Sequence, residues 1–275
     1  MKSLYSDEKK ILPFLKWAGG KRWLVRHHAE LVPDFSGVYC EPFLGSGAMF
    51  FHVLPKAALL SDRNSELVEA YKAIKDDWRA VLSKLKEHHR KHSPDYYYVV
   101  RDSSPTKPHT KAARFIYLNR TCWNGLYRVN LKGKFNVPVG TKQNALLATD
   151  DFESVSRALS FADLICGDFE EIVNQAGRGD FVFVDPPYTV KHNHNGFIKY
   201  NENLFSWDDQ VRLKSSIDKA VFRGAKVLVS NADHESVREL YGDYKQHPLD
   251  RLNVLSGNPQ FRGRYSELII QCGYT

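Results

Sequence analysis

Apolar residues along this 275-residue chain follow two alternating spacings, which predict strands followed by helices. Short runs of β-branched and aromatic residues, such as 181–184 (FVFV), are bounded by Gly-Asp and by proline, as buried strands commonly are. Stretches in which apolar residues recur three and four positions apart predict amphipathic helices. The expected strands are 38–43, 57–61, 164–166, 181–184, 226–230 and 267–272, and the expected helices include 65–74, 169–175, 207–222 and 234–241. This alternation is the pattern of an α/β fold.

Residues 76–149 interrupt the alternation. They begin with a stretch, 76–102, that looks mainly helical and then loop-like, and a further helix is expected at 111–120. Residues 129–137 then alternate around Lys132-Gly133 as a hairpin does. We therefore predict a main α/β domain made of residues 1–75 and 150–275, with an inserted helical and hairpin domain at 76–149.

A glycine turn, Gly45-Ser46-Gly47, follows the strand expected at 38–43 and precedes a helix. Strand, G-x-G and helix form the dinucleotide-binding arrangement, but the third glycine of the phosphate fingerprint is missing. The turn therefore suits a nucleoside without a pyrophosphate, such as S-adenosylmethionine. The next strand ends at Asp62, where a carboxylate can accept hydrogen bonds from ribose hydroxyls. The alternative is that Asp62 belongs to a helix-cap cluster with Asn64.

A second glycine motif, Gly19-Gly20-Lys21, lies before a short helical spacing of apolar residues. The glycines allow a tight turn, and a lysine beside a helix start can hold a carboxylate. Taken alone, this motif is not specific.

The tetrapeptide Asp185-Pro186-Pro187-Tyr188 follows the strand at 181–184. The prolines fix φ and remove two backbone donors, so the Asp185 carboxylate and the Pro186 carbonyl can present acceptors side by side. Such a pair suits a flat group that carries an NH2, such as adenine, while Tyr188 stacks on the base. A plain strand-end turn is the alternative. Asp168 follows another expected strand and could also accept from an adenine amine, with Phe169 stacking on that ring.

Composition is that of a globular protein, with 43% hydrophobic and 26% charged residues. No apolar run approaches the ~18 residues of a membrane span, and residues 1–10 lack the apolar core of a signal peptide. We therefore expect a cytoplasmic protein that does not span a membrane.

The net charge of +7 lies in one segment, 103–149, which has no Asp or Glu. The rest of the chain carries 31 basic against 32 acidic residues. Cations mixed with aromatic rings suit a surface that meets phosphates and bases, although a solvated face is the alternative. The eight cations are Lys107, Lys111, Arg114, Arg120, Arg128, Lys132, Lys134 and Lys142, and the aromatic residues include Tyr117, Trp123, Tyr127 and Phe135.

Cysteine and histidine patterns do not predict a metal site. The cysteines are far apart without a C-x-x-C pair, so we expect buried, reduced thiols. Three histidines fall on a strongly charged expected helix, which favours a solvated face, and an H-x-H pair in the polar loop 189–203 has no third ligand nearby. The cysteines are Cys40, Cys122, Cys166 and Cys272; the histidines are His88, His89 and His92, and the pair is His192 and His194.

Four motifs, in order, give the chain a resemblance to a known family: 14–21 (FLKWAGGK), 41–47 (EPFLGSG), 118–140 (LNRTCWNGLYRVNLKGKFNVPVG) and 185–188 (DPPY). Over nearly its full length the chain resembles the Dam-type, D12 class DNA adenine N6-methyltransferases. The resemblance implies a Rossmann-like, seven-stranded S-adenosylmethionine-dependent methyltransferase sheet with an inserted target-recognition domain. It also implies methyl transfer to adenine in double-stranded DNA after base flipping, without a metal.

The resemblance also implies site residues. Asp185, Pro186 and Tyr188 match the family's adenine site. The positions that match its cofactor pocket are Trp17, Lys21, Glu41, Phe43, Gly45, Gly47, Asp62, Asp168, Phe169 and Asp185.

The stretch that reads the DNA bases in the family aligns with Trp123, Asn124, Leu126, Arg128 and Pro138, so GATC is the leading target. Trp123 departs from the family, where tyrosine is usual. Further DNA contacts are expected from Lys132, Lys134 and Arg262. Two alternatives stay open: another planar amine as acceptor (cytosine N4, RNA or a protein amide), or a non-catalytic DNA-binding regulator. The sequence fits a solitary, restriction-associated or phage-encoded enzyme equally, and we expect a monomer.

Overall fold

The computed structural model describes residues 10–130, 133–190, 205–252 and 264–275. Contacts divide the chain into two compact units. Unit 1 comprises Met1–His27, Gly45–Leu54 and Asn64–Ala162, and unit 2 comprises His28–Leu44, Pro55–Arg63 and Asp163–Thr275. The assignment of catalysis to residues 1–75 and 150–275, and of target recognition to 76–149, concerns function and stays a prediction.

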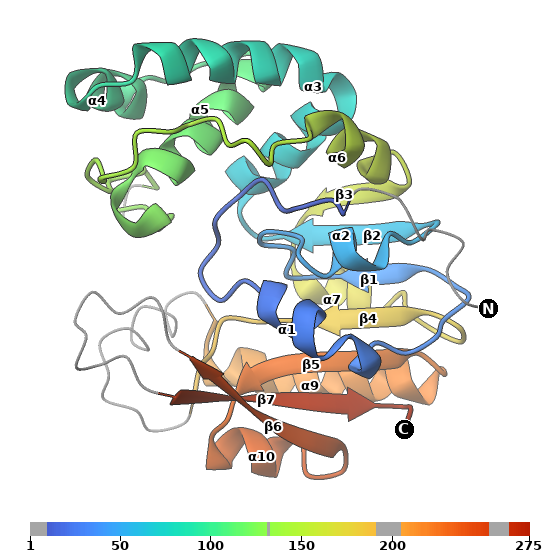
Figure 1. The fold of residues 1–275 in the computed structure, drawn as a ribbon. Helices are drawn as coiled ribbons and strands as arrows, with labels where there is room; N and C mark the ends of the chain where they lie inside the picture. The colour runs from blue at the N-terminus through green and yellow to red at the C-terminus, as the bar shows by residue number, and fades with distance from the viewer. Residues whose placement is uncertain (1–9, 131–132, 191–204, 253–263) are drawn as a thin grey trace. The chain divides into compact units, whose positions relative to one another are not determined.

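A seven-stranded sheet forms the centre of unit 2 in the described residues, with the order β3-β2-β1-β4-β5-β7-β6 (Figure 1). β1 is parallel to β2 and β4, β4 is parallel to β5, and β7 is antiparallel to β5 and β6. The predicted α/β sheet is thus confirmed. The strands are β1 (Tyr39–Glu41), β2 (Ala58–Asp62), β3 (Ala162–Cys166), β4 (Phe181–Val184), β5 (Lys226–Ala232), β6 (Lys245–Leu252) and β7 (Arg264–Cys272).

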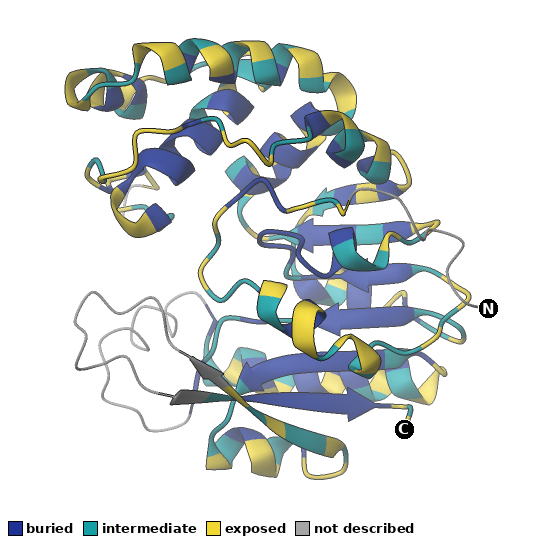
Figure 2. Cartoon of the chain, viewed as in Figure 1, coloured by how far each residue is buried: buried dark blue, intermediate teal, exposed yellow. Residues whose placement is uncertain are grey.

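Both faces of the central strand β4 are buried, which explains its uninterrupted apolar sequence. Val182 and Val184 join one hydrophobic core with helices α7 (Phe169–Val173) and α9 (Trp207–Phe222). Phe181 packs on the other face, with its ring 5.5 Å from Phe35 and 5.6 Å from Tyr39. Figure 2 shows the same burial along the neighbouring strands β1 and β5. Unit 2 also contains η1 (Ala29–Leu31) and α10 (Glu235–Leu240).

Strand β6 is an element that the hydrophobic pattern did not predict. Its sequence, KQHPLDRL, has charged residues and Pro248 where a central strand would have apolar ones. β6 lies at the edge of the sheet and pairs with β7 alone, and an edge strand tolerates proline and charge.

Helices form most of the described part of unit 1. The helix α3 packs against α5 and α6. Figure 2 shows that α5 is buried along most of its length, whereas α3 keeps an exposed face. Two of the helices were not expected, since α4 replaces the predicted loop and α6 lacked a clear signal. The helices are α1 (Arg22–His27), α2 (Phe50–Val53), α3 (Ser65–Lys91), α4 (Pro94–Asp102), α5 (Pro108–Thr121), η2 (Trp123–Gly125) and α6 (Phe152–Leu159).

Arg120, near the end of α5, holds three segments of unit 1 together and is almost completely buried. Its guanidinium donates to both carboxylate oxygens of Asp150, at 2.6 and 2.7 Å. It also donates to the carbonyls of Phe14 and Ala145. Arg120 therefore belongs to the core, and its inclusion among the cations of a DNA-binding surface was wrong.

The cysteines confirm the expected burial at three positions and contradict it at one. Cys166 is exposed, whereas the other three cysteines are buried as predicted. Burial raises the pKa of the Cys40 thiol to about 12 and that of Cys122 to about 11.

None of the described helices is long and apolar enough to cross a bilayer.

His88 is buried in α3, and its placement on a solvated face was wrong. The sequence pattern was misleading because charged neighbours surround a position that faces α5. The Nδ1 of His88 lies 2.9 Å from the Tyr96 hydroxyl, and its ring packs 5.1 Å from that of Tyr117. His92 is also engaged, at 2.8 Å from the Tyr117 hydroxyl.

Burial lowers the pKa of His88 from 6.5 to about 4, so stability should depend on pH. Below pH 6.5 the unfolded chain takes up a proton that the folded chain does not bind until about pH 4. The free energy of unfolding should therefore fall by about 1–3 kcal/mol as pH decreases through this window. Urea unfolding across this pH range should show a smaller decrease in His88→Gln, whereas His27→Gln, at an exposed histidine, should match wild type. Equal decreases in wild type and His88→Gln would contradict the assignment.

Candidate active site

The strand order of unit 2 reverses between β1 and β4, with β2 and β3 on one side and β4 and β5 on the other. Ligands of open α/β sheets bind beyond the carboxyl ends of the strands at such a reversal. Glu41 ends β1, and Asp185 directly follows β4. Because β1 and β4 are parallel, these two acidic residues lie at the same edge of the sheet.

Glu41 is fixed by its own strand. Its carboxylate accepts a hydrogen bond of 2.7 Å from the hydroxyl of Tyr39, two residues earlier and therefore on the same face. Burial, followed by the nearby Glu41 charge, raises the pKa of Tyr39 well above its ordinary value. The hydroxyl thus remains a donor, and the carboxylate has a defined orientation.

Tyr188 of the tetrapeptide is tied to strands β5 and β7. Its hydroxyl donates to Glu267 at 2.8 Å and lies 2.8 Å from the hydroxyl of Ser230, which can donate to it. Burial, then the charges of Asp185 and Glu267, raises the pKa of Tyr188 well above its ordinary value. The phenol is therefore neutral, and the two strands fix the position of the ring.

Phe43 and Phe169 stack at this edge of the sheet, with ring centroids 5.6 Å apart and planes 26° apart. Phe205 contacts both rings edge-on. These three side chains pack together in the hydrophobic core of unit 2.

The carboxylate of Asp168 is held by Arg212, which donates to its two oxygens at 2.8 and 3.0 Å. It also accepts from the backbone N–H of Glu170 and caps α7. The Arg212 hydrogen bonds are the main cause that lowers the pKa of Asp168. The guanidinium lies 4.3 Å from the centroid of Phe169. Contact of Asp168 with an adenine amine stays a prediction.

Asp62 ends β2, and its backbone carbonyl accepts from the N–H of Gly167 at 3.3 Å. Within unit 2 this bond joins the residue after β3 to the end of β2. In unit 1, Asn64 caps α3 by accepting from the N–H of Leu67, as predicted. A ribose contact of Asp62 stays a prediction.

Unit 1 carries the other predicted cofactor residues, which are Trp17, Lys21, Gly45 and Gly47. Gly45 and Gly47 have φ values of +47° and +65°, which favour glycine. A Cβ at Gly45 would lie 2.7 Å from the Trp17 ring, so only glycine allows this approach. Lys21 is buried and donates to the carbonyl of Gly19 at 2.6 Å.

The segment predicted to read bases is a loop and hairpin of unit 1. Antiparallel bridges join Cys122 to Val139 and Val129 to Phe135, which confirms the hairpin. Trp123 is 53% exposed, and Leu126 is 39% exposed. The other predicted contacts in the described residues, Asn124, Arg128, Lys134 and Pro138, are exposed as well. Lys132 and Arg262 lie outside the described residues, as do His192 and His194.

Several residues expected on the cationic, aromatic surface are instead structural. Arg114 donates to the carbonyls of Val100 and Arg101 at the end of α4, and its side chain is only 13% exposed. Tyr117 and Phe135 are buried. Lys107, Arg128, Lys134 and Lys142 remain exposed. The sequence shows the excess of positive charge, but it does not show which cationic side chains point into the protein and which point to solvent.

No group of three potential metal-ligating side chains occurs in the described ranges.

A comparison with protein families identifies the chain. The family described as "D12 class N6 adenine-specific DNA methyltransferase" matches this chain over residues 17–254, which is most of its length. The chain belongs to this family. This membership confirms the resemblance inferred from the four motifs.

Relatives match the D12 methyltransferase described here along nearly its whole length. It is 36% identical to the type II methyltransferase M1.LlaDCHI of Lactococcus lactis subsp. cremoris, with 98% of each chain covered. It is also 36% identical to the type II methyltransferase M.MjaIII of Methanocaldococcus jannaschii, over 95% of this chain and 99% of that one. The DNA adenine methylase of Haemophilus influenzae is 31% identical over 94% of this chain and 93% of its own. The chain is an adenine-specific DNA methyltransferase.

Three residues around the candidate site were not predicted: Arg212, Ser230 and Glu267. None lies near a motif, and only the topology brings β7 beside β5, which places Glu267 close to Tyr188. The sequence signal that could have indicated Glu267 is a glutamate beside the apolar run of the last strand. The structure shows that this side chain is only 6% exposed.

The hydrogen bond between Tyr188 and Glu267 should contribute to stability. Tyr188→Phe leaves a buried carboxylate without this donor and should lower the free energy of unfolding by about 1–3 kcal/mol. Glu267→Gln should cost less, because its amide oxygen still accepts. In the double variant the two costs should not add, as denaturant unfolding can measure. Tyr98→Phe, at an exposed tyrosine, is the control; additive costs would show that the two residues do not interact.

Proposed function

We propose that this enzyme transfers the methyl group of S-adenosylmethionine to the N6 atom of adenine within GATC in double-stranded DNA. The observation that carries the proposal is the end of β4, where the Asp185-Pro186-Pro187-Tyr188 tetrapeptide lies at the reversal of strand order. The tyrosine of this tetrapeptide is neutral and anchored, and the prolines remove competing donors.

In the proposed reaction, the Asp185 carboxylate and the Pro186 carbonyl each accept one N–H of the adenine amine. Two such hydrogen bonds favour the pyramidal nitrogen, whose lone pair can then attack. The ring of Tyr188 stacks on the flipped base, with its orientation fixed by Glu267 and Ser230. S-adenosylmethionine would supply an electrophilic methyl group, whose bond to sulfur would break as the bond to N6 forms. The methylated amine would then lose one proton to solvent, and a metal ion is not required.

Each unit, taken by itself, carries residues proposed to contact the cofactor and has a feature that supports this role. In unit 1, Gly45 gives a backbone close to the Trp17 ring, a position that a side chain would fill. In unit 2, the end of β1 at the strand reversal presents the fixed carboxylate of Glu41. The proposed contacts are Trp17, Lys21, Glu41, Phe43, Gly45, Gly47, Asp62, Asp168, Phe169 and Asp185.

Target reading is assigned to the exposed side chains of the loop and hairpin. Arginine and asparagine are the side chains that pair with guanine and adenine edges, and an apolar side chain suits the thymine methyl group. Arg128, Asn124 and Leu126 provide these three chemistries. Lys134 would contact phosphates. The relatives at 36% identity are named type II methyltransferases, which supports a role in restriction–modification.

Labelled methyl transfer to two duplexes that differ only in one GATC tests this function. We expect N6-methyladenine only in the GATC duplex, and Asp185→Ala should abolish transfer while retaining DNA binding. Asp163→Ala, at an exposed acid before the end of β3, is the matched control. Labelling of both duplexes would refute GATC specificity, and methylcytosine or labelled RNA would reveal another acceptor. DNA binding without S-adenosylmethionine binding would favour a regulator.

Arg128 should discriminate at one base pair. Its guanidinium is exposed and is oriented by a hydrogen bond of 3.1 Å to Asn136. Arg128→Ala should reduce the preference for GATC over a duplex changed at that base pair by ~1–3 kcal/mol in kcat/KM. Lys142→Ala, which removes an exposed cation outside the predicted readers, should preserve the preference. An unchanged preference in Arg128→Ala would exclude base reading by this residue.

A further inference from the structure

Tyr127 points into unit 1, between two residues that point out of it. Leu126 and Arg128 are exposed, and both belong to the proposed base-reading set. Tyr127 is partly buried and lies against the helices. Its side chain is therefore the one in this tripeptide that can set the position of the segment.

The ring of Tyr127 lies among three aromatic side chains. It stacks on Trp17, with centroids 5.7 Å apart and planes 24° apart. It also packs 5.3 Å from Phe115 of α5 and 5.7 Å from Phe135 of the hairpin. Three aromatic neighbours thus contact the ring, and its hydroxyl remains as the group that can form a directional hydrogen bond.

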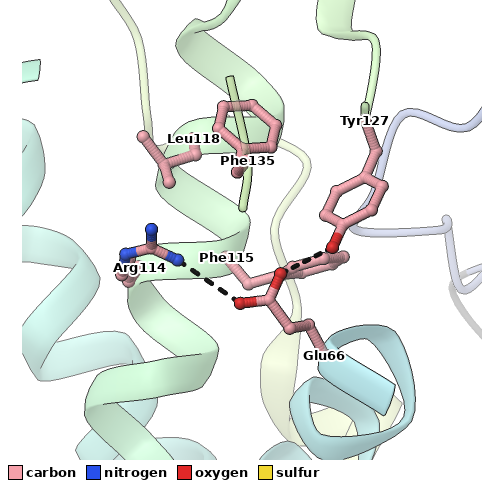
Figure 3. A pocket seen from close by; sticks show the side chains of 6 residues that line it. All are labelled: Glu66, Arg114, Phe115, Leu118, Tyr127 and Phe135. Atoms are coloured by element: carbon pink, nitrogen blue, oxygen red, sulfur yellow. Dashed lines mark hydrogen bonds and ion pairs between the residues drawn. The ribbon is translucent and has the colours of Figure 1, made fainter. Parts of the chain in front are cut away.

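The hydroxyl of Tyr127 donates to Glu66 Oε2 at 2.6 Å, as Figure 3 shows. The other oxygen of Glu66 lies 3.4 Å from Arg114. Burial, then the hydrogen bond and charge of Glu66, raises the pKa of Tyr127. The phenol therefore donates throughout the working pH range.

Glu66 is oriented by contacts on both of its carboxylate oxygens, one with Tyr127 and one with Arg114, although its side chain is 42% exposed. It lies in the first turn of α3, where a carboxylate is stabilised by the helix dipole. Arg114, on the other side, is held by the carbonyls of Val100 and Arg101. The chain of contacts thus runs from the end of α4 through Arg114 and Glu66 to the loop.

We infer that Glu66 and Tyr127 are positioning residues for target discrimination, which set the orientation of Leu126 and Arg128 without touching DNA. This inference rests on the proposed base-reading role of residues 123–128. A recognition group must be held to within about 0.5 Å for its hydrogen bonds to discriminate. Loss of the Tyr127–Glu66 bond should therefore lower the preference for the correct base pair more than it lowers binding to DNA phosphates.

The test compares kcat/KM on a GATC duplex with that on duplexes changed at single base pairs. Tyr127→Phe keeps the ring and removes the donor, and Glu66→Gln keeps the shape and removes the charge. Tyr127→Phe should reduce the preference ~5- to 30-fold, the effect of one hydrogen bond. Glu66→Gln should reduce it less, because its amide oxygen still accepts from Tyr127. The double variant should lose little more. Glu69→Gln is the matched control, because Glu69 lies on the same helix but pairs with Lys111 at 3.1 Å on the surface.

The outcomes separate this inference from the proposed function. A wild-type enzyme that methylates all duplexes equally would refute sequence reading itself. A selective wild type with equally selective Tyr127→Phe and Glu66→Gln would overturn the positioning role alone. Equal losses of kcat/KM on all duplexes would also overturn it, since they indicate a structural role. Thermal unfolding of each variant shows whether the protein is folded in the assay.

Discussion

The reversal of strand order between β1 and β4 is the constraint on which the candidate site in unit 2 depends. Parallel strands send all their carboxyl ends to one edge, and the reversal separates the connections that follow β1 and β4. Glu41 and Asp185 lie at this point because Glu41 is the last residue of the buried strand β1 and Asp185 directly follows the buried strand β4. The apolar strands therefore determine the position of the polar residues, although they carry no chemistry themselves.

Buried polar contacts then fix the orientation of side chains that the strands and helices bring close together. Arg120 holds Asp150 and the carbonyl of Phe14 in unit 1, and Glu267 holds the hydroxyl of Tyr188 in unit 2. Each contact costs desolvation, so its net contribution to stability is modest. The larger effect of such a contact is on orientation. A hydrogen-bonded side chain has one favoured position, whereas a side chain held by apolar contacts can adopt several.

Sequence patterns predicted the central strands well because β4 and β5 are buried on both faces and carry uninterrupted apolar runs. They missed β6, since Pro248 and its charged neighbours are tolerated only at a sheet edge, which is a property of the topology. Charge counting found the basic segment but included Arg120, which is buried. Motifs located Asp185 and Tyr188, whereas Glu267 could be assigned only once β7 was seen beside β5.

The charges around Tyr188 suit the proposed reaction. Asp185 and Glu267 both act on the phenol, and a phenolate between two carboxylates would be strongly disfavoured. Tyr188 is thus neutral, so its proton satisfies Glu267 while its ring remains available for stacking. Asp168 is already balanced by Arg212. A sulfonium cation would then be attracted by the carboxylates at the ends of β1 and β4. Transfer of the methyl group would leave the sulfur neutral and remove that attraction, which would favour release of the spent cofactor.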